Sequence, residues 1–325
     1  MGDSPHIEME FVSCDLCGGT DHDLLFTKLD SVTGLEFNLV LCRCGMAFVN
    51  PAPVEESTPG IYPADYLSDK DIDDPMYLAM LGLLPKPAAG RLLDVGCGKG
   101  EFVLHASRVG WEAEGVDLID WGSPYPVEIT VGDLAELPFP RASYDVVTAW
   151  AVLEHLRAPS RFFRKIGELL RPGGRFIFVV PNVSAPGMKI SCAEDIPRHM
   201  WLFSPRTVRA YLSRFGMEAA RIRHSGKIYR AYPFGLLRHA LLGRSRSERR
   251  CAKYENKAVA LLRNRQFRSN EVAWFRDVVR ELGPVDLALD IADLTLSVCL
   301  ANLSKLLANY GIITIEAVRT TDEPK

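Results

Sequence analysis

The stretch Arg91-Leu92-Leu93-Asp94-Val95-Gly96-Cys97-Gly98-Lys99-Gly100-Glu101-Phe102 decides the fold of this 325-residue chain. It reads as a short apolar strand, a turn with three glycines and the start of a helix. Glycine lets a ligand approach the backbone closely, and α/β sheets bind ligands at the carboxyl ends of their parallel strands. We therefore expect a nucleotide-like ligand at this turn.

The spacing of the glycines excludes two common phosphate-binding loops. A P-loop requires Gly-Lys-Ser/Thr, whereas Lys99 is followed by Gly100. A dinucleotide site requires Gly-x-Gly-x-x-Gly, whereas this turn is Gly-x-Gly-x-Gly with Asp94 before it and Glu101 after it. Both acids disfavour a pyrophosphate, so an adenosine ligand without phosphates fits better.

Further strand-like segments follow at the intervals of an α/β fold. They are expected at 112–117, 127–129, 144–150, 175–180, 217–223 and from Ile312 onward. Helices are expected over 160–170 and from Pro205, with Ser204 as the N-cap. Only nine residues separate Asp117 from Val127, too few for a full crossover helix, so this link is expected to be irregular.

The motifs L-L-D-V-G-C-G-K-G, G-V-D, G-D-L-A-E-L-P-F, Y-D-V-V, L-E-H-L and L-L-R-P-G-G-R occur in this order. Together they resemble the class I S-adenosylmethionine-dependent methyltransferases, over about residues 90 to 225 and a last strand. The resemblance implies an α/β fold with a Rossmann-like seven-stranded sheet, preceded by a small zinc module similar to those of methyltransferases that act on sugars and other small molecules. The helical pattern of residues 229–310 predicts a helical insertion before the last strand.

The resemblance also implies roles for residues that would bind S-adenosyl-L-methionine. Asp117 would accept hydrogen bonds from both ribose hydroxyls. Apart from the resemblance, the aromatic side chains of Trp150, which we count among the cofactor residues, and Trp201 are candidates to line the acceptor pocket. The methionine, ribose and adenine contacts would come from Asp94, Gly96, Gly98, Gly100, Asp133 and Leu134. A turn role for Asp133 and a core role for the tryptophans are the alternatives.

Two histidines are candidates for the group that removes the acceptor's proton. His155 follows the fourth strand, and His199 lies in Pro197-Arg198-His199-Met200-Trp201. A structural role is the alternative for each. Glu154 is expected to face away from His155, because adjacent residues on a helix point about 100° apart. Tyr62 and Tyr66 precede the first strand of the core and either cover the cofactor or cap an apolar surface.

Four cysteines near the N-terminus indicate a metal site. Cys14 and Cys17 form one pair, Cys42 and Cys44 the other, and glycines follow both pairs. This pattern is typical of tetrahedral zinc on two turns, with a structural role. The second pair is Cys-x-Cys, so His6 or His22 is an alternative ligand, and four reduced cysteines without metal are a further alternative.

These patterns divide the chain into five parts. The prediction is a zinc-binding cysteine module at 1–50, a linker and cofactor-covering segment at 51–89, the methyltransferase core at 90–228, a helical insertion at 229–310, and the last strand and tail at 311–325. Residues 285–307 are apolar, but the charged side chains among them make a membrane span costly, so a buried or dimerising helix is expected.

The charge is spread unevenly along the chain. Its net value is only −3, yet nine Lys/Arg residues lie between Arg244 and Arg268. An anionic membrane surface or a phosphate-bearing substrate is the expected partner of this stretch, with a solvated helix face as the alternative. The first six residues lack the pattern of a secretion signal, so a cytoplasmic protein is expected, peripheral to the membrane if the basic stretch binds lipid.

The function expected from the sequence is methyl transfer from S-adenosylmethionine to a small-molecule, sugar or lipid-linked glycan acceptor. A ribosomal or transfer RNA methyltransferase is the first alternative. A pI of 6.2 and a basic stretch far from the cysteines make nucleic acid an unlikely partner. A non-catalytic cofactor-binding protein is the second alternative.

Overall fold

The computed structural model describes residues 7–30, 32–62, 74–86, 90–185, 195–224, 228 and 311–320, with four helical positions at 292, 295, 296 and 299. The basic stretch from Arg244 to Arg268 and Tyr66 lie outside the described residues, as does His6. The predicted helical insertion at 229–310 also lies outside the described residues, except for the four helical positions named above. None of the described helices has both the length and the apolar character needed to cross a lipid bilayer.

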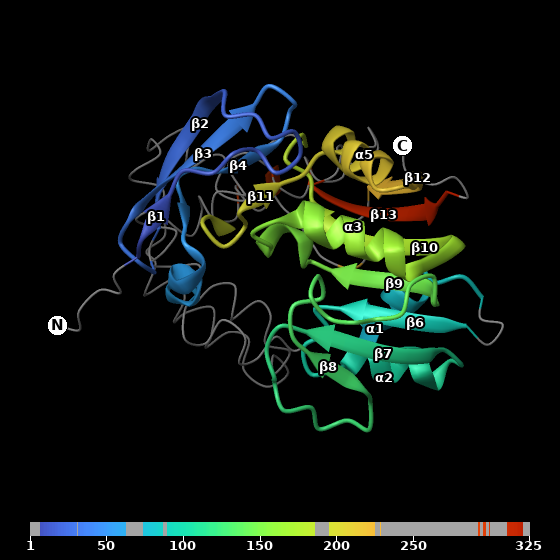
Figure 1. Ribbon diagram of the computed structural model, residues 1–325. Helices are drawn as coiled ribbons and strands as arrows, with labels where there is room; N and C mark the ends of the chain where they lie inside the picture. Colours follow the sequence, from blue (N-terminus) through green and yellow to red (C-terminus); the bar gives the residue numbers. More distant parts are fainter. Residues whose placement is uncertain are drawn as a thin grey trace.

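The core of the fold is a seven-stranded sheet with the order β12-β13-β10-β9-β6-β7-β8 (Figure 1). Five consecutive strands of this sheet are parallel to one another: β10, β9, β6, β7 and β8. Strand β13 is antiparallel to both β10 and β12. The strands are β6 (Arg91–Val95), β7 (Glu112–Asp117), β8 (Ile129–Val131), β9 (Tyr144–Trp150), β10 (Leu170–Pro181), β12 (Met217–His224) and β13 (Ile312–Arg319). This arrangement confirms the predicted Rossmann-like sheet.

Most strands begin and end close to their predicted positions. The strand expected at 127–129 forms at Ile129–Val131, and the described residues between β7 and β8 contain no helix, as their number predicted. Strand β10 is longer than expected because it starts at Leu170 and continues through Gly173 and Gly174 with a register shift before Arg175.

Helices cover both faces of the sheet (Figure 1). On one face α1 (Asp74–Leu81) and α2 (Glu101–Arg108) pack over Leu92, Val146 and Ile177. On the other face α3 (Pro159–Leu169) and α5 (Pro205–Arg214) pack over strand residues that include Phe176 and Phe178. Successive residues of a strand point to opposite faces, so a nearly continuous apolar run fills both layers.

The N-terminal module forms its own four-stranded sheet, with the order β11-β4-β3-β2. Its strands are β2 (His22–Leu29), β3 (Glu36–Cys42), β4 (Ala47–Val49) and β11 (Trp201–Leu202). The last of these comes from the core, between β10 and α5. A separate pair, β1 (Met9–Glu10) with β5 (Ala52–Pro53), and the 3-10 helix η1 (Glu55–Ile61) connect the module to the core.

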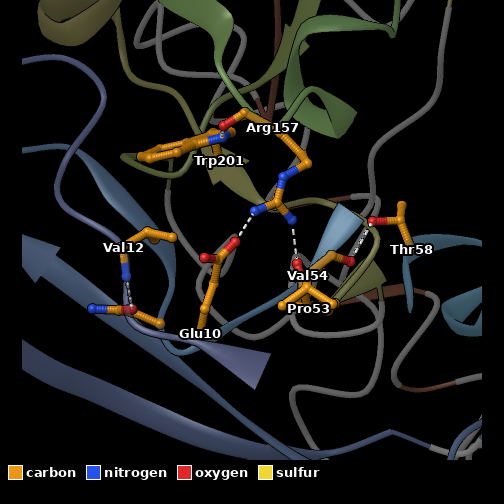
Figure 2. A network of polar contacts seen from close by, with 8 residues as sticks. Glu10, Val12, Pro53, Val54, Thr58, Arg157 and Trp201 are labelled. Carbon is orange, nitrogen blue, oxygen red and sulfur yellow. Dashed lines mark hydrogen bonds and ion pairs between the residues drawn. The ribbon is translucent and has the colours of Figure 1, made fainter. Parts of the chain in front are cut away.

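Several polar contacts fix the module against the core. Asp15 accepts hydrogen bonds from the Ser160 hydroxyl at 2.7 Å and the Tyr211 hydroxyl at 2.8 Å. Arg157 bonds to the Glu10 carboxylate and the Pro53 carbonyl, while the Trp201 indole N–H donates to the Arg157 carbonyl at 3.3 Å (Figure 2). Figure 1 shows the module on the side of the sheet towards which the carboxyl ends of β6, β7 and β9 point.

Candidate functional site

The glycine turn borders open space at the carboxyl end of β6. Gly96 and Gly98 both have left-handed backbone angles, with φ of +69° and +57°. A Cβ on Gly96 would lie 2.5 Å from Val152 Cγ2, whereas a Cβ on Gly98 would meet nothing within 4 Å. Gly96 therefore lets the turn pack against the segment after β9, and Gly98 borders space that a ligand can fill.

Asp94 is a buried carboxyl directly beside this turn. Its side chain is 2% exposed, and the Thr148 hydroxyl on β9 donates to it at 2.6 Å. Burial raises the pKa of Asp94 to about 8, the bond from Thr148 opposes this, and the charge of Asp117 adds to it. A cationic ligand placed here would favour the ionised form of Asp94.

Asp117, at the end of β7, shapes the other side of the turn. One carboxylate oxygen accepts from the Gly98 N–H at 2.9 Å. The other accepts from the Ile119 N–H at 3.0 Å and the Trp121 indole N–H at 3.1 Å. These bonds hold the carboxylate at the turn, where the predicted ribose contact requires it.

The remaining predicted cofactor residues lie around this centre. The Asp133 carboxylate accepts from the Ala135 N–H at 2.8 Å and lies 3.7 Å from the Arg161 guanidinium. Asp133 therefore stabilises a turn, which was the alternative role, and its contact with a ligand stays a prediction. Leu134 is 2% exposed, so its contact with a ligand would come from the backbone. Trp150 packs edge-on against Phe102, and its indole nitrogen has no hydrogen-bond partner among the described residues.

The structure brings the two predicted histidines together. The ring centroids of His155 and His199 are 4.7 Å apart. His155 Nδ1 lies 3.1 Å from the Arg198 carbonyl oxygen and 3.3 Å from the Tyr62 hydroxyl. Tyr62 therefore lies beside the histidines, and its position over a cofactor stays a prediction. Burial raises the pKa of its hydroxyl to about 12. Since a carbonyl oxygen can only accept, His155 Nδ1 donates in the contact with Arg198.

The expectation that Glu154 faces away from this site is wrong. Ligand atoms of Glu154, His155 and His199 all lie within 4.8 Å of one another. The expectation assumed an α-helix, but Leu153–His155 is a single 3-10 turn, η2. Strand β11 then brings His199 to the same place, because Met200 N–H donates to the Glu154 carbonyl at 2.8 Å. We call these three side chains the Glu-His-His cluster.

A buried ion pair joins this cluster to the N-terminal module. Arg198 Nη1 lies 3.3 Å from the Asp30 carboxylate and donates to the Ile61 carbonyl at 3.1 Å. Asp30 belongs to the turn between β2 and β3, where its second oxygen accepts from the Thr33 N–H at 2.9 Å. The module therefore supports the segment that carries His199.

The four predicted cysteines gather in the module as expected. Cys14 Sγ lies 3.6 Å from Cys44 Sγ, Cys17 Sγ lies 3.5 Å from Cys42 Sγ, and all four sulfurs are within 4.8 Å of one another. His22 lies opposite Cys42 in the β2–β3 pair, but its side chain is not part of the sulfur group, because its Nε2 lies 2.8 Å from the Asn50 amide. Four thiols at these distances fit the tetrahedral coordination of zinc, in which neighbouring sulfurs are about 3.8 Å apart for a Zn–S bond of about 2.3 Å.

Sequence reasoning missed the roles of Asp30, Trp121 and Arg198 in this site. None belongs to a motif, and each contributes through a contact between segments. The Pro-Arg-His context of His199 was the only available signal for Arg198.

Comparison with known proteins gives a consistent result for the core. Residues 73–221 match the model of a family described as "Methyltransferase domain". A probable S-adenosylmethionine-dependent methyltransferase of Mycolicibacterium smegmatis is 39% identical over 101 residues, which are 29% of this chain and 39% of that protein. This chain therefore spans well under half the length of that relative.

Two further relatives and one solved structure are also similar to part of this chain. A ubiquinone biosynthesis O-methyltransferase of Xanthomonas axonopodis pv. citri is 28% identical, covering 48% of this chain and 73% of that protein. The 27-O-demethylrifamycin SV methyltransferase of Amycolatopsis mediterranei is 33% identical over 114 residues, covering 30% and 40%. A methyltransferase structure from Archaeoglobus fulgidus superimposes with a TM-score of 0.45 at 17% identity, covering 74% and 92%.

Proposed function

We propose that the chain carries a class I S-adenosylmethionine-dependent methyltransferase domain and transfers a methyl group to a small-molecule acceptor. The proposal rests on the open space beside Gly98, which the carboxyls of Asp94 and Asp117 border. A ligand with a cationic amino acid portion and two vicinal hydroxyls matches these groups. When bound, S-adenosylmethionine supplies an activated methyl group on a sulfonium.

The residues of the chain would act mainly by positioning. Displacement at a sulfonium removes charge, so alignment of the two reactants and exclusion of water account for much of the acceleration. The Glu-His-His cluster follows β9, whose parallel neighbour β6 leads into the glycine turn. It is therefore the group of side chains that would meet the acceptor's nucleophile.

The acceptor class is supported by the relatives. Two of them are named as methyltransferases for ubiquinone biosynthesis and for a rifamycin, which are small molecules. A hydroxyl acceptor is accordingly the first choice. Sugars and lipid-linked glycans remain part of the proposal, since a lipid-linked acceptor would suit the basic stretch between Arg244 and Arg268.

Calorimetry with S-adenosylmethionine and its demethylated product tests the cofactor. We expect micromolar binding of both, and turnover against a metabolite extract rather than against RNA. Asp117→Ala is expected to weaken binding by about 1.5–3 kcal/mol, since it removes hydrogen bonds to a charged group. Asp120→Ala, which removes only a bond to the Gly122 N–H, is the control. No heat with either ligand would contradict the proposal.

We further propose that Cys14, Cys17, Cys42 and Cys44 hold one structural zinc ion. The four sulfurs leave no open position for a substrate, so the ion would act on folding. Elemental analysis is expected to find one zinc per chain. Cys14→Ser should lower both the metal content and the stability, whereas Cys299→Ser, at an exposed position outside the group, should change neither. A metal content near zero in zinc-replete protein would rule the site out.

A further inference from the structure

The Glu-His-His cluster has the composition of a metal site. It offers one carboxylate and two imidazoles, with one ligand atom of each within 4.8 Å of the others. Two histidines and one carboxylate are the protein ligands of many catalytic zinc and non-haem iron centres, which keep positions open for substrate. The cluster is separate from the cysteine group, which already contains four ligands of its own.

His155 is also oriented as a metal-bound histidine is. A metal-bound histidine almost always offers its second ring nitrogen to a carbonyl or a carboxylate. His155 Nδ1 lies 3.1 Å from the Arg198 carbonyl oxygen, and His199 Nδ1 lies 3.7 Å from the Asp195 carboxylate. The first contact indicates that His155 Nδ1 donates to the carbonyl, which leaves its Nε2 as the ligand atom, whereas the Asp195 contact is too long for a hydrogen bond and assigns no tautomer to His199.

The charges around the cluster favour a cation. Glu154 is 1% exposed and Asp30 is 1% exposed, while Arg198 is the guanidinium paired with Asp30. The surroundings of the cluster thus include two buried carboxylates and one guanidinium, with the more exposed Asp195 carboxylate beside His199. Buried charges in proteins are paired or coordinate metals, and surroundings rich in carboxylates favour a divalent cation.

We propose that Glu154, His155 and His199 bind one divalent first-row transition metal ion at the acceptor end of the site. The role of the ion rests on the proposed function: it would bind the acceptor's hydroxyl oxygen and lower the pKa of that hydroxyl. The hydroxyl proton would pass to solvent, the oxygen would form the new bond to the methyl carbon, and the bond from that carbon to the sulfonium sulfur would break. In this arrangement the imidazoles are ligands and do not accept the proton.

The test is metal binding by the full chain with its cysteine group loaded with zinc. Mn²⁺ and Co²⁺ are titrated separately by calorimetry, and Mn²⁺ also by the loss of its free-ion paramagnetic resonance signal. Mn²⁺ prefers oxygen and nitrogen ligands to thiolates, so it discriminates against the cysteines. We expect one site, with the dissociation constant raised at least about tenfold in Glu154→Gln, His199→Gln and His155→Asn.

Matched controls separate loss of a ligand from loss of the fold. His105→Gln removes a histidine that stacks on Tyr77, outside the cluster, and should leave Mn²⁺ binding unchanged. His155→Asn changes the least buried member of the cluster, and thermal unfolding of each variant shows whether it is folded. Failure to bind either ion, or binding that is equally tight in all three cluster variants, would overturn the proposal. Neither result depends on whether the chain binds S-adenosylmethionine.

Discussion

Asp30 Oδ1 lies 3.3 Å from Arg198 Nη1, and the two side chains are 1% and 9% exposed. The pair joins a turn of the N-terminal module to the residue that precedes His199. The carbonyl of Arg198 also faces His155 Nδ1 at 3.1 Å. One buried ion pair therefore couples the stability of the module to the position of both histidines.

Asp30→Asn is expected to destabilise the protein by about 3–5 kcal/mol, because it leaves the Arg198 charge buried without its partner. Unfolding in denaturant measures this loss. Asp21→Asn is the matched control, since Asp21 pairs with Arg43 at the surface, where the side chains are 66% and 82% exposed. Its effect should stay below about 1 kcal/mol. Equal losses in the two variants would show that the buried pair has no special role.

Gly98→Ala is expected to abolish tight binding of S-adenosylmethionine without unfolding the protein. The new methyl group would enter the space that the ligand needs, although it meets no protein atom within 4 Å. Gly122→Ala is the control because Gly122 has a similar φ of +63° and is equally open. Both variants should lose about 1–2 kcal/mol of stability from the left-handed backbone. Only Gly98→Ala should lose at least about tenfold in affinity by calorimetry, and wild-type affinity in that variant would place the ligand elsewhere.

The affinity for S-adenosylmethionine is expected to increase from pH 5.5 to 7.5. The pKa of Asp94 is about 8 in the free protein, so this carboxyl is largely protonated over that range. A cationic ligand favours the carboxylate, so binding releases a proton, and the affinity rises by at most about tenfold per pH unit. Calorimetry in buffers of different ionisation enthalpy measures the released proton.

Asp94→Asn is expected to remove this pH dependence together with the proton release. The stability of the ligand-free wild-type protein, unlike its affinity for the ligand, should fall as the pH rises. A carboxyl whose pKa is raised on folding stabilises the protein below its unfolded pKa, and this contribution is lost as the pH rises towards 8. A wild-type affinity that is flat between pH 5.5 and 7.5 would show that Asp94 does not face the cation.

Without a bound ion at the Glu-His-His cluster, one imidazole would have to accept the acceptor's proton, and His155→Ala or His199→Ala would then lower turnover at saturating cofactor by about a hundredfold to ten-thousandfold. His155 is the first choice because its Nδ1 is already bonded to the Arg198 carbonyl. Cofactor affinity, measured alongside, should stay unchanged. A loss confined to His199→Ala would transfer the role to that residue, and rates within about threefold of wild type for both would leave positioning as the source of the acceleration.

The sequence predicted those parts of the fold that local patterns determine. The apolar run before Gly96, the helix stop after Leu170 and the Ser204 cap are all properties of short segments, and strands or helices formed at each. The gathering of the four cysteines was also predictable, because two close pairs of thiols flank one hairpin.

The parts that were missed depend on contacts between distant segments. Asp30 and Arg198 are 168 positions apart, and nothing in the neighbourhood of either residue indicates the other. Glu154 was misplaced for a related reason: a single 3-10 turn does not follow the angular spacing of an α-helix, and the position of His199 depends on the pairing of β11 with β4. Periodicity carries no information about such pairings.

The pairing of β4 with β11 also sets an order of events during synthesis. Ala47 and Phe48 leave the ribosome early, whereas their partners Leu202 and Trp201 follow more than 150 residues later. At about 5–20 residues per second, roughly 8–30 s pass between the synthesis of β4 and that of its partner strand β11. An unpaired edge with a large apolar side chain such as Phe48 is a site where two nascent chains can join. The ribosome therefore has to finish most of the α/β core before the first fifty residues are protected from aggregation.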